Sequence, residues 1–235
     1  MKKNHVLDQK SRPRPNFFLA GAAKSGTTSL WMYLKQHPEI FMPTQIKEPT
    51  YFCHTYGFKD YERYFSLFES ANGFKAIGEA SHAYLSSPES AELIKKFDPS
   101  AKIIIVLRNP VDRSYSLYNW MVNAGYEWVS PFEQALKVEK KRLTSKKFKE
   151  NNPQYYYNYL YFHSGLYSQQ IERYRELFPK EQIRIFLFED LKENILDLLK
   201  EIYGFLEVDP TFIPQDLDVY NSFTIPKSAK LQFLI

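Results

Sequence analysis

The stretch Asn16-Phe17-Phe18-Leu19-Ala20-Gly21-Ala22-Ala23-Lys24-Ser25-Gly26-Thr27-Thr28-Ser29-Leu30 decides the fold of this chain. Residues 16–20 form an apolar run that predicts a short buried strand. Small residues at 21–26 predict a tight loop, and a helical spacing of apolar residues follows from Thr27. This helix is expected to stop before His37-Pro38, because a residue that precedes proline disfavours helical backbone. The opening unit is therefore a strand, a tight loop and a helix.

The alternation of strands and helices continues along the chain. Further strands are predicted at 76–79, 102–107 and 183–188, and the β-branched run at 102–107 is typical of a strand buried on both faces. Helices are predicted at 88–97, at 110–124, from a capping box at Ser130-Pro131-Phe132-Glu133, at 171–178, and from Ile195 to a closing Gly204. This alternation indicates the α/β class with a parallel sheet.

Composition and charge restrict the kind of protein. With 235 residues, 44% hydrophobic and 25% charged, the chain suits one globular domain. Its apolar runs are far shorter than the roughly 20 residues of a membrane span. Cys53 is the single cysteine, which excludes an intrachain disulfide and a cysteine-based zinc site. No secretory signal follows the basic start, so we expect a cytoplasmic protein. Residues 1–15 are expected to form a flexible basic arm, and 16–235 the domain.

The loop at 21–26 is predicted to hold an anion. Backbone N–H groups converge in such a loop, and the following helix N-terminus adds positive potential. Gly21 and Gly26 have the spacing of a nucleotide-triphosphate loop, but Thr27 stands where that pattern requires lysine, and Lys24 lies inside the loop. We therefore expect Lys24 to reach a phosphate-like group without an obligatory Mg²⁺. The alternative is a tight turn with an exposed lysine.

A second cationic position follows the strand at 102–107. Arg108 lies where ligands bind in open α/β sheets, and Pro110 begins a helix on which Ser116 offers a hydroxyl. An arginine binds a terminal phosphate in a two-pronged manner. The alternative for Arg108 is a salt bridge at the strand end, and Arg113 would be a surface charge paired with Asp112 or a glutamate.

Two motifs carry a resemblance to a known family. Ala22-Ala23-Lys24-Ser25-Gly26-Thr27-Thr28-Ser29-Leu30 resembles the 5′-phosphosulfate loop of the sulfotransferases, and Arg108-Asn109-Pro110-Val111-Asp112-Arg113-Ser114-Tyr115-Ser116 is similar to their 3′-phosphate motif. Gly165-Leu166-Tyr167 and Phe188-Glu189-Asp190-Leu191 look like later landmarks of the family. The similarity is to the carbohydrate (heparan-sulfate-like) and bacterial branch.

The resemblance implies a P-loop-like three-layer α/β fold and the donor 3′-phosphoadenosine-5′-phosphosulfate (PAPS), with its desulfated form PAP as product and no metal. Lys24 would be catalytic and would contact the donor. The other donor-binding residues would be Ser25, Gly26, Thr27, Thr28, Ser29, Arg108, Ser116 and Lys227. Lys227 lies in a late loop that resembles one of the family, and because family members usually continue with further helices, we expect a shortened C-terminus.

The acceptor side depends on Glu48. The segment 47–52 resembles the acidic motif before two aromatics in heparan-type enzymes, so Glu48 would be the general base, with Lys47 tuning its pKa or touching the donor. The alternatives are that both are loop charges, or that His54 or His82 is the base. Segment 78–84 resembles a family segment that carries a second lysine, which is Ala80 here, and Glu79 and Ser81 are expected to face the cleft.

A basic stretch and a tyrosine cluster remain open in role. Lysines and Arg142 between 137 and 149, and the tyrosines at 155–161, would grip an acidic or sugar-rich acceptor, or form a solvated helix and core rings. We expect a PAPS-dependent sulfotransferase that acts on a hydroxyl or amine of a glycan, without nucleic acid as partner. The rivals are a P-loop kinase or nucleotide-binding protein, a non-catalytic PAPS-binding module, and an RNA-binding module.

Overall fold

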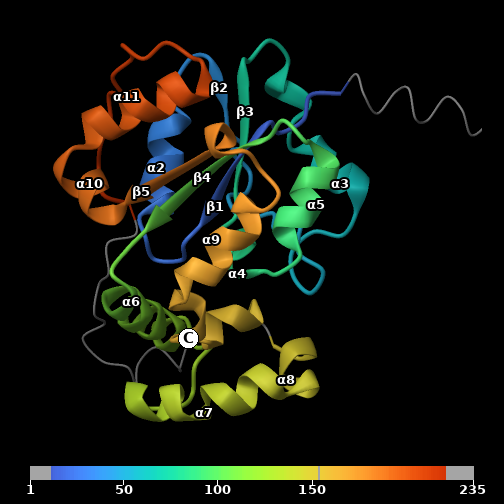
Figure 1. Cartoon of the computed structure of the whole chain (residues 1–235), viewed down its shortest axis with the longest axis vertical. Helices are drawn as coiled ribbons and strands as arrows, with labels where there is room; N and C mark the ends of the chain where they lie inside the picture. The colour runs from blue at the N-terminus through green and yellow to red at the C-terminus, as the bar shows by residue number, and fades with distance from the viewer. Residues whose placement is uncertain (1–11, 153, 221–235) are drawn as a thin grey trace, which may run out of the picture.

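The computed structural model describes residues 12–152 and 154–220, and within them a parallel sheet forms the centre of the molecule (Figure 1). Its strands are β1 (Phe17–Gly21), β2 (Ile40–Phe41), β3 (Ala76–Ala80), β4 (Lys102–Leu107) and β5 (Ile183–Leu187), in the order β2-β3-β1-β4-β5. All pairs are parallel. The predicted α/β class with a central parallel sheet is therefore confirmed.

Helices cover both faces of this sheet. They are α2 (Thr27–Leu34), α3 (Tyr61–Ser66), α4 (Ala83–Ser86), α5 (Ser90–Phe97), α6 (Pro110–Asn123), α7 (Phe132–Thr144), α8 (Lys146–Glu150), α9 (Tyr167–Arg175), α10 (Phe188–Glu193) and α11 (Ile195–Leu206). Short 3-10 turns occur at η1 (Glu69–Ala71), η2 (Tyr156–Tyr159), η3 (His163–Gly165) and η4 (Lys180–Gln182). In Figure 1, α2, α10 and α11 lie on one side of the sheet, α3, α4, α5 and α9 on the other, and α6, α7 and α8 lie below its edge.

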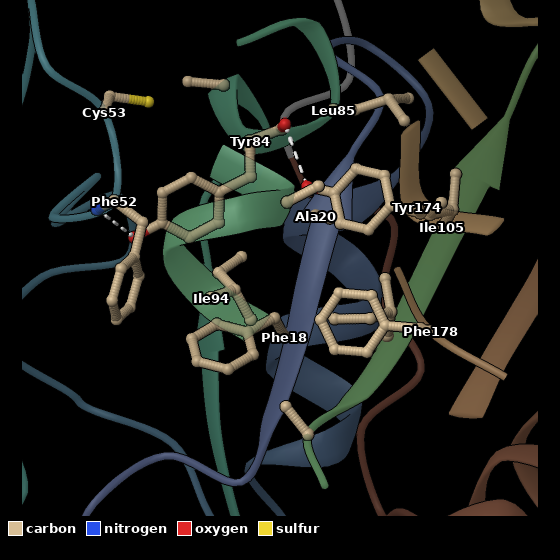
Figure 2. Packing of buried hydrophobic residues seen from close by; sticks show 14 of the residues in the cluster. Phe18, Ala20, Phe52, Cys53, Tyr84, Leu85, Ile94, Ile105, Tyr174 and Phe178 are labelled. Carbon is tan, nitrogen blue, oxygen red and sulfur yellow. Dashed lines mark hydrogen bonds between the residues drawn. The ribbon is translucent and has the colours of Figure 1, made fainter. Parts of the chain in front are cut away.

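Alternate residues of β1 divide the core into two layers. Phe17 and Leu19 pack with α2 and α11, whereas Phe18 and Ala20 pack with α4, α5 and α9. Figure 2 shows the second layer, in which the rings of Tyr84, Tyr174 and Phe178 gather around β1 and β4. Because both faces of the strand are covered, every residue of β1 is buried, and its sequence is a continuous run of apolar and small residues.

The strands that the sequence predicts are found, with small shifts at their ends, but β2 was not predicted. It contains only Ile40 and Phe41, too short a run to give a periodic signal. The helix that follows β1, α2, lies on one face of the sheet. The connection from β4 to β5 includes α9, which lies on the other face. The carboxyl ends of the adjacent strands β1 and β4 therefore flank a switch point, where open α/β sheets bind ligands.

Two predicted helix ends are wrong. Ser130 does not cap α7: Pro131 is the N-cap residue in extended conformation, no side-chain cap forms, and the helix begins at Phe132, whose ring packs on Tyr118. Gly204 does not end α11, which continues because Phe205 and Leu206 are buried against the sheet; Glu207, in left-handed conformation, ends it instead.

A third apolar cluster holds α6, α7 and η2 together, and it contains a buried ion pair. Arg142 of α7 binds both carboxylate oxygens of Glu127, at 2.6 and 2.8 Å, and Tyr161 donates to the same carboxylate at 2.7 Å. Tyr155, Tyr156, Tyr159 and Tyr161 are buried. Most of the tyrosine cluster is therefore core, and Arg142 is structural, while the lysines at 137, 140, 141, 146 and 147 are exposed.

Candidate active site

The loop after β1 is tightly enclosed. Gly21 has φ +154°, and a Cβ there would lie 2.7 Å from Cβ of Leu85. Gly26 caps α2 with φ +79°, and its added Cβ would lie 3.0 Å from the ring of Phe188. Glycine is thus required at both ends of the loop, for backbone conformation and for space. The first N–H groups of α2 have no partner within the helix, so they are available to an anion.

Lys24 projects from this loop in left-handed conformation, with φ +63°. It is half-buried, and its ammonium lies 5.9 Å from the centre of the Trp120 ring. Desolvation by burial lowers the pKa of Lys24, and the nearby charges of Arg108 and Lys47 lower it further. Lys24 and Arg108 meet at the loop, and within the described residues neither forms an ion pair with a carboxylate, whereas Lys47 is paired with Glu48. Two such cations give the site a positive potential that favours an anionic ligand.

Arg108 lies at the carboxyl end of β4 and touches the same loop. Its Nη1 donates to the backbone oxygen of Lys24 at 3.2 Å, and its guanidinium lies 4.8 Å from the centre of the Phe188 ring. Tyr167 in turn donates to the backbone oxygen of Arg108 at 3.0 Å. Within residues 12–152 and 154–220, Arg108 forms no ion pair with a carboxylate, so the alternative of a strand-end salt bridge finds no support.

The first turns of α6 place Ser116 and Arg113 in different surroundings. Asn109 caps the helix by accepting from the N–H groups of Val111 and Asp112. Ser116 is half-buried on the same helix. Arg113 is fully buried and donates to the backbone oxygen of Tyr161 at 2.6 Å. The expectation that Arg113 is a surface charge is therefore wrong, because the helix turns it inward onto η3.

Glu48 lies beside the loop at 21–26, between Lys47 and His82. Lys47 Nζ is 2.5 Å from Glu48 Oε1 and 3.3 Å from the hydroxyl of Thr27. Glu48 Oε2 accepts from the backbone N–H of His82 and lies 2.9 Å from its Nδ1. The far nitrogen of His82 is 3.3 Å from Oδ1 of Asn158. Glu48 and His82 thus form one unit, whereas His54 is exposed and has Glu89 as its backbone partner.

The surroundings of Glu48 keep its carboxylate ionised. Burial alone would raise the pKa of Glu48, but the charges of His82 and Lys47 and the hydrogen bonds from both more than offset burial. The pKa of Glu48 therefore lies well below its usual range. The carboxylate is therefore in the form that accepts a proton, but a pKa this far below neutral makes it a weaker base than a group poised near pH 7.

The remaining predicted residues divide into several groups. Ser25 in the loop and Thr27 at the start of α2 are buried, and the hydroxyl of Ser29 accepts from the backbone N–H of Tyr220 at 3.0 Å.

Glu79 and Ser81 do not face a cleft: both are 0% exposed, because β3 is covered on both faces. Lys227 and residues 1–11 lie outside the described residues. Asn158 was not predicted, since nothing in the sequence relates it to His82, 76 positions away.

A family model described as the sulfotransferase domain matches residues 14–230. The chain belongs to the sulfotransferase family. The resemblance to this family, stated from the two phosphate motifs, is confirmed.

Sulfotransferases of solved structure share this fold. A sulfotransferase from Alicyclobacillus acidocaldarius is 33% identical with a TM-score of 0.77, and the match covers 94% of this chain and 90% of that one. Mouse sulfotransferase SULT7A1 complexed with PAP is 17% identical with a TM-score of 0.50, covering 88% and 65%. At that identity the second likeness concerns the fold alone.

Curated relatives are longer than this sulfotransferase. The membrane-associated sulfotransferase kil1 of Dictyostelium discoideum is 26% identical over 83% of this chain and 56% of its own length. The mouse bifunctional heparan sulfate N-deacetylase/N-sulfotransferase 4 is 26% identical over 84% of this chain and 23% of its own length. The chain therefore spans about half or less of the length of these relatives.

Among the described residues, no helix has the length and apolarity to cross a membrane, and no three His, Cys, Asp or Glu side chains group as metal ligands.

Proposed function

We propose that this sulfotransferase transfers a sulfuryl group from PAPS to a hydroxyl or amine of a carbohydrate. The observation that carries the proposal is the junction of Lys24 and Arg108, which follow adjacent strands and are linked by a 3.2 Å hydrogen bond. One ligand with phosphates at both ends fits this pair of cations better than two unrelated anions, because a single nucleotide can span the ends of β1 and β4.

In this proposal the loop holds the 5′ end of the donor and Arg108 the 3′ end. Ser25, Gly26, Thr27, Thr28 and Ser29 line the phosphosulfate, and Arg108 with Ser116 binds the 3′-phosphate, joined by Lys227. The glycine at 26 supports backbone binding of the phosphosulfate, because it caps α2 with a positive φ and leaves the first N–H groups of the helix facing the loop. PAP bound to the mouse enzyme of the same fold supports this donor.

The reaction divides between two residues. The acceptor oxygen or nitrogen forms a bond to sulfur as the bond from sulfur to the 5′-phosphate oxygen breaks, and PAP leaves. Lys24 stabilises the charge that develops on that oxygen. Glu48 takes the acceptor proton, and His82, 2.9 Å away, orients its carboxylate. No metal is assigned a part in these steps.

The glycan acceptor rests on the relatives and on the site. The heparan sulfate enzyme of mouse acts on a carbohydrate by its name, and half-buried rings of Trp120, Tyr126 and Tyr56 lie near Lys24 and Glu48. Aromatic rings offer sugars an apolar face. Ala80 stands where glycan-modifying relatives have a lysine. The identity of the sugar and the position that is sulfated are therefore not inferred from those relatives.

Transfer of labelled sulfate from PAPS to a panel of glycans, lipids and phenols tests the proposal. We expect a labelled glycan, with phenols and lipids unlabelled, and loss of label with Lys24→Ala. ATP hydrolysis or phosphoryl transfer that depends on Mg²⁺ would instead favour a P-loop kinase. PAP binding without transfer to any acceptor would favour a non-catalytic PAPS-binding module. Affinity for RNA would favour an RNA-binding module. The cytoplasmic location stays a prediction, for cell fractionation to test against the membrane association of the Dictyostelium relative.

A further inference from the structure

A buried carboxylate behind the site has no part in the reaction described above. Glu79 of β3 is 0% exposed, and the hydrogen bonds that the described residues make to its carboxylate come from three hydroxyl groups. Ser81 donates to Oε1 at 2.5 Å, and Tyr64 and Tyr84 donate to Oε2 at 2.7 and 2.9 Å. Burying a carboxylate is costly, and the three hydroxyl donors offset part of that cost.

Two of these hydroxyls have a second partner, and both partners lie in the segment that carries Glu48. Ser81 Oγ accepts from the backbone N–H of Thr50 at 3.0 Å, and Tyr84 accepts from the backbone N–H of Phe52 at 3.3 Å (Figure 2). A hydroxyl has one proton to donate. Because that proton points to Glu79, the lone pairs of each hydroxyl are turned toward the backbone of residues 50–52.

The segment needs such anchors. Thr50 has φ +52°, a left-handed conformation that is unfavourable for a β-branched residue and persists only when its surroundings enforce it. Its own hydroxyl donates to the backbone oxygen of Glu48 at 3.2 Å, so the turn at Thr50 sets the direction in which the chain presents Glu48. A relaxed Thr50 would move the Glu48 carboxylate away from His82 and the loop.

We propose that Glu79 is a positioning residue, whose carboxylate holds the backbone of Thr50 and Phe52 through Ser81 and Tyr84 and thereby fixes Glu48 beside the phosphate loop. This inference rests on the proposed role of Glu48 as general base. It assigns a function to an acidic residue that never touches substrate. The donor site on Lys24 and Arg108 does not depend on it.

Two tyrosines offer a matched test. Tyr64→Phe and Tyr84→Phe each remove one buried hydroxyl donor from the same oxygen of Glu79, but only Tyr84 holds the backbone. We expect Tyr84→Phe to lower kcat about tenfold or more, as displacement of a catalytic group does, with unchanged affinity for PAP. Tyr64→Phe should keep kcat within about twofold of the wild type. Amide hydrogen exchange at Phe52 should accelerate in Tyr84→Phe only.

Ser81→Ala is the second variant, and it removes a single atom. We expect it to lower kcat and to speed exchange at Thr50 without weakening PAP binding. Equal kcat in Tyr64→Phe and Tyr84→Phe, together with wild-type kcat in Ser81→Ala, would overturn the positioning role. So would an equal loss of PAP affinity and kcat.

The Glu48→Gln background separates this inference from the function on which it rests. Residues that act through one another are not additive. In the Glu48→Gln background, where the base is already absent, Tyr84→Phe should therefore cause no further loss of kcat. Full turnover of Glu48→Gln alone would refute the base role of Glu48, whereas an inactive Glu48→Gln beside an additive Tyr84→Phe would refute only the role of Glu79.

Discussion

At the scale of single residues, two arginines on adjacent strands provide a controlled test of the donor site. Arg108 and Arg184 each lie over a phenylalanine ring, at 4.8 and 4.7 Å, but only Arg108 contacts the phosphate loop. Charge-assisted hydrogen bonds contribute about 1.5–3 kcal/mol. We therefore expect Arg108→Ala to weaken PAP binding about tenfold or more in calorimetry, and Arg184→Ala to leave it unchanged. Equal affinities of the two variants would remove Arg108 from the site.

At the scale of elements, two glycines respond to alanine in opposite ways. A Cβ at Gly78 of β3 would overlap the Phe17 ring of β1 and the sulfur of Met42, whereas at Gly204 of α11 it meets nothing within 4 Å. We expect Gly78→Ala to lower the free energy of unfolding by about 1–3 kcal/mol through overpacking. Gly204→Ala should raise it by about 0.5–1 kcal/mol, because alanine favours the helix interior. Urea unfolding of both variants measures the two changes, and a stabilised Gly78→Ala would contradict the packing of β3 on β1.

At the scale of the whole molecule, Glu79 makes stability depend on pH. Desolvation by burial and, to a smaller extent, the negative charge of Glu48 raise the pKa of Glu79 to about 7, although the hydrogen bonds from Ser81, Tyr64 and Tyr84 lower it. The folded chain then binds this proton between about pH 4.5 and 7 while the unfolded chain has lost it, so Glu79 lowers stability as pH rises through that window.

Unfolding of the wild type and Glu79→Gln across this pH range measures the contribution of Glu79. The wild type should lose stability relative to Glu79→Gln as pH rises from about 4.5 to about 7. Glu48→Gln serves as a control whose difference from the wild type should stay constant in this range, because the stability that the lowered pKa of Glu48 contributes is lost only below its unfolded pKa. A constant difference between the wild type and Glu79→Gln would contradict the raised pKa.

The parts of this molecule that sequence alone predicts are those built from neighbours in the chain. The strand, loop and helix around Lys24 and the strand before Arg108 depend on local apolar runs and small residues, and the structure has them where expected. Ser130 and Gly204 mislead because tertiary burial overrides local capping preferences. Contacts between Glu48, His82 and Asn158, and those around Glu79, join separate segments and leave no periodic trace in the sequence.

The hydrogen bond from Arg108 to the backbone of Lys24 has a consequence for donor choice. Arg108, which would bind the 3′-phosphate, also contacts the backbone of Lys24, which would bind the 5′ end. The two halves of the donor site are therefore coupled. A donor that lacks the 3′-phosphate would leave the guanidinium without its anion and the lysine less firmly aimed. Discrimination against adenosine 5′-phosphosulfate should then appear as slower turnover even when that analogue saturates the enzyme.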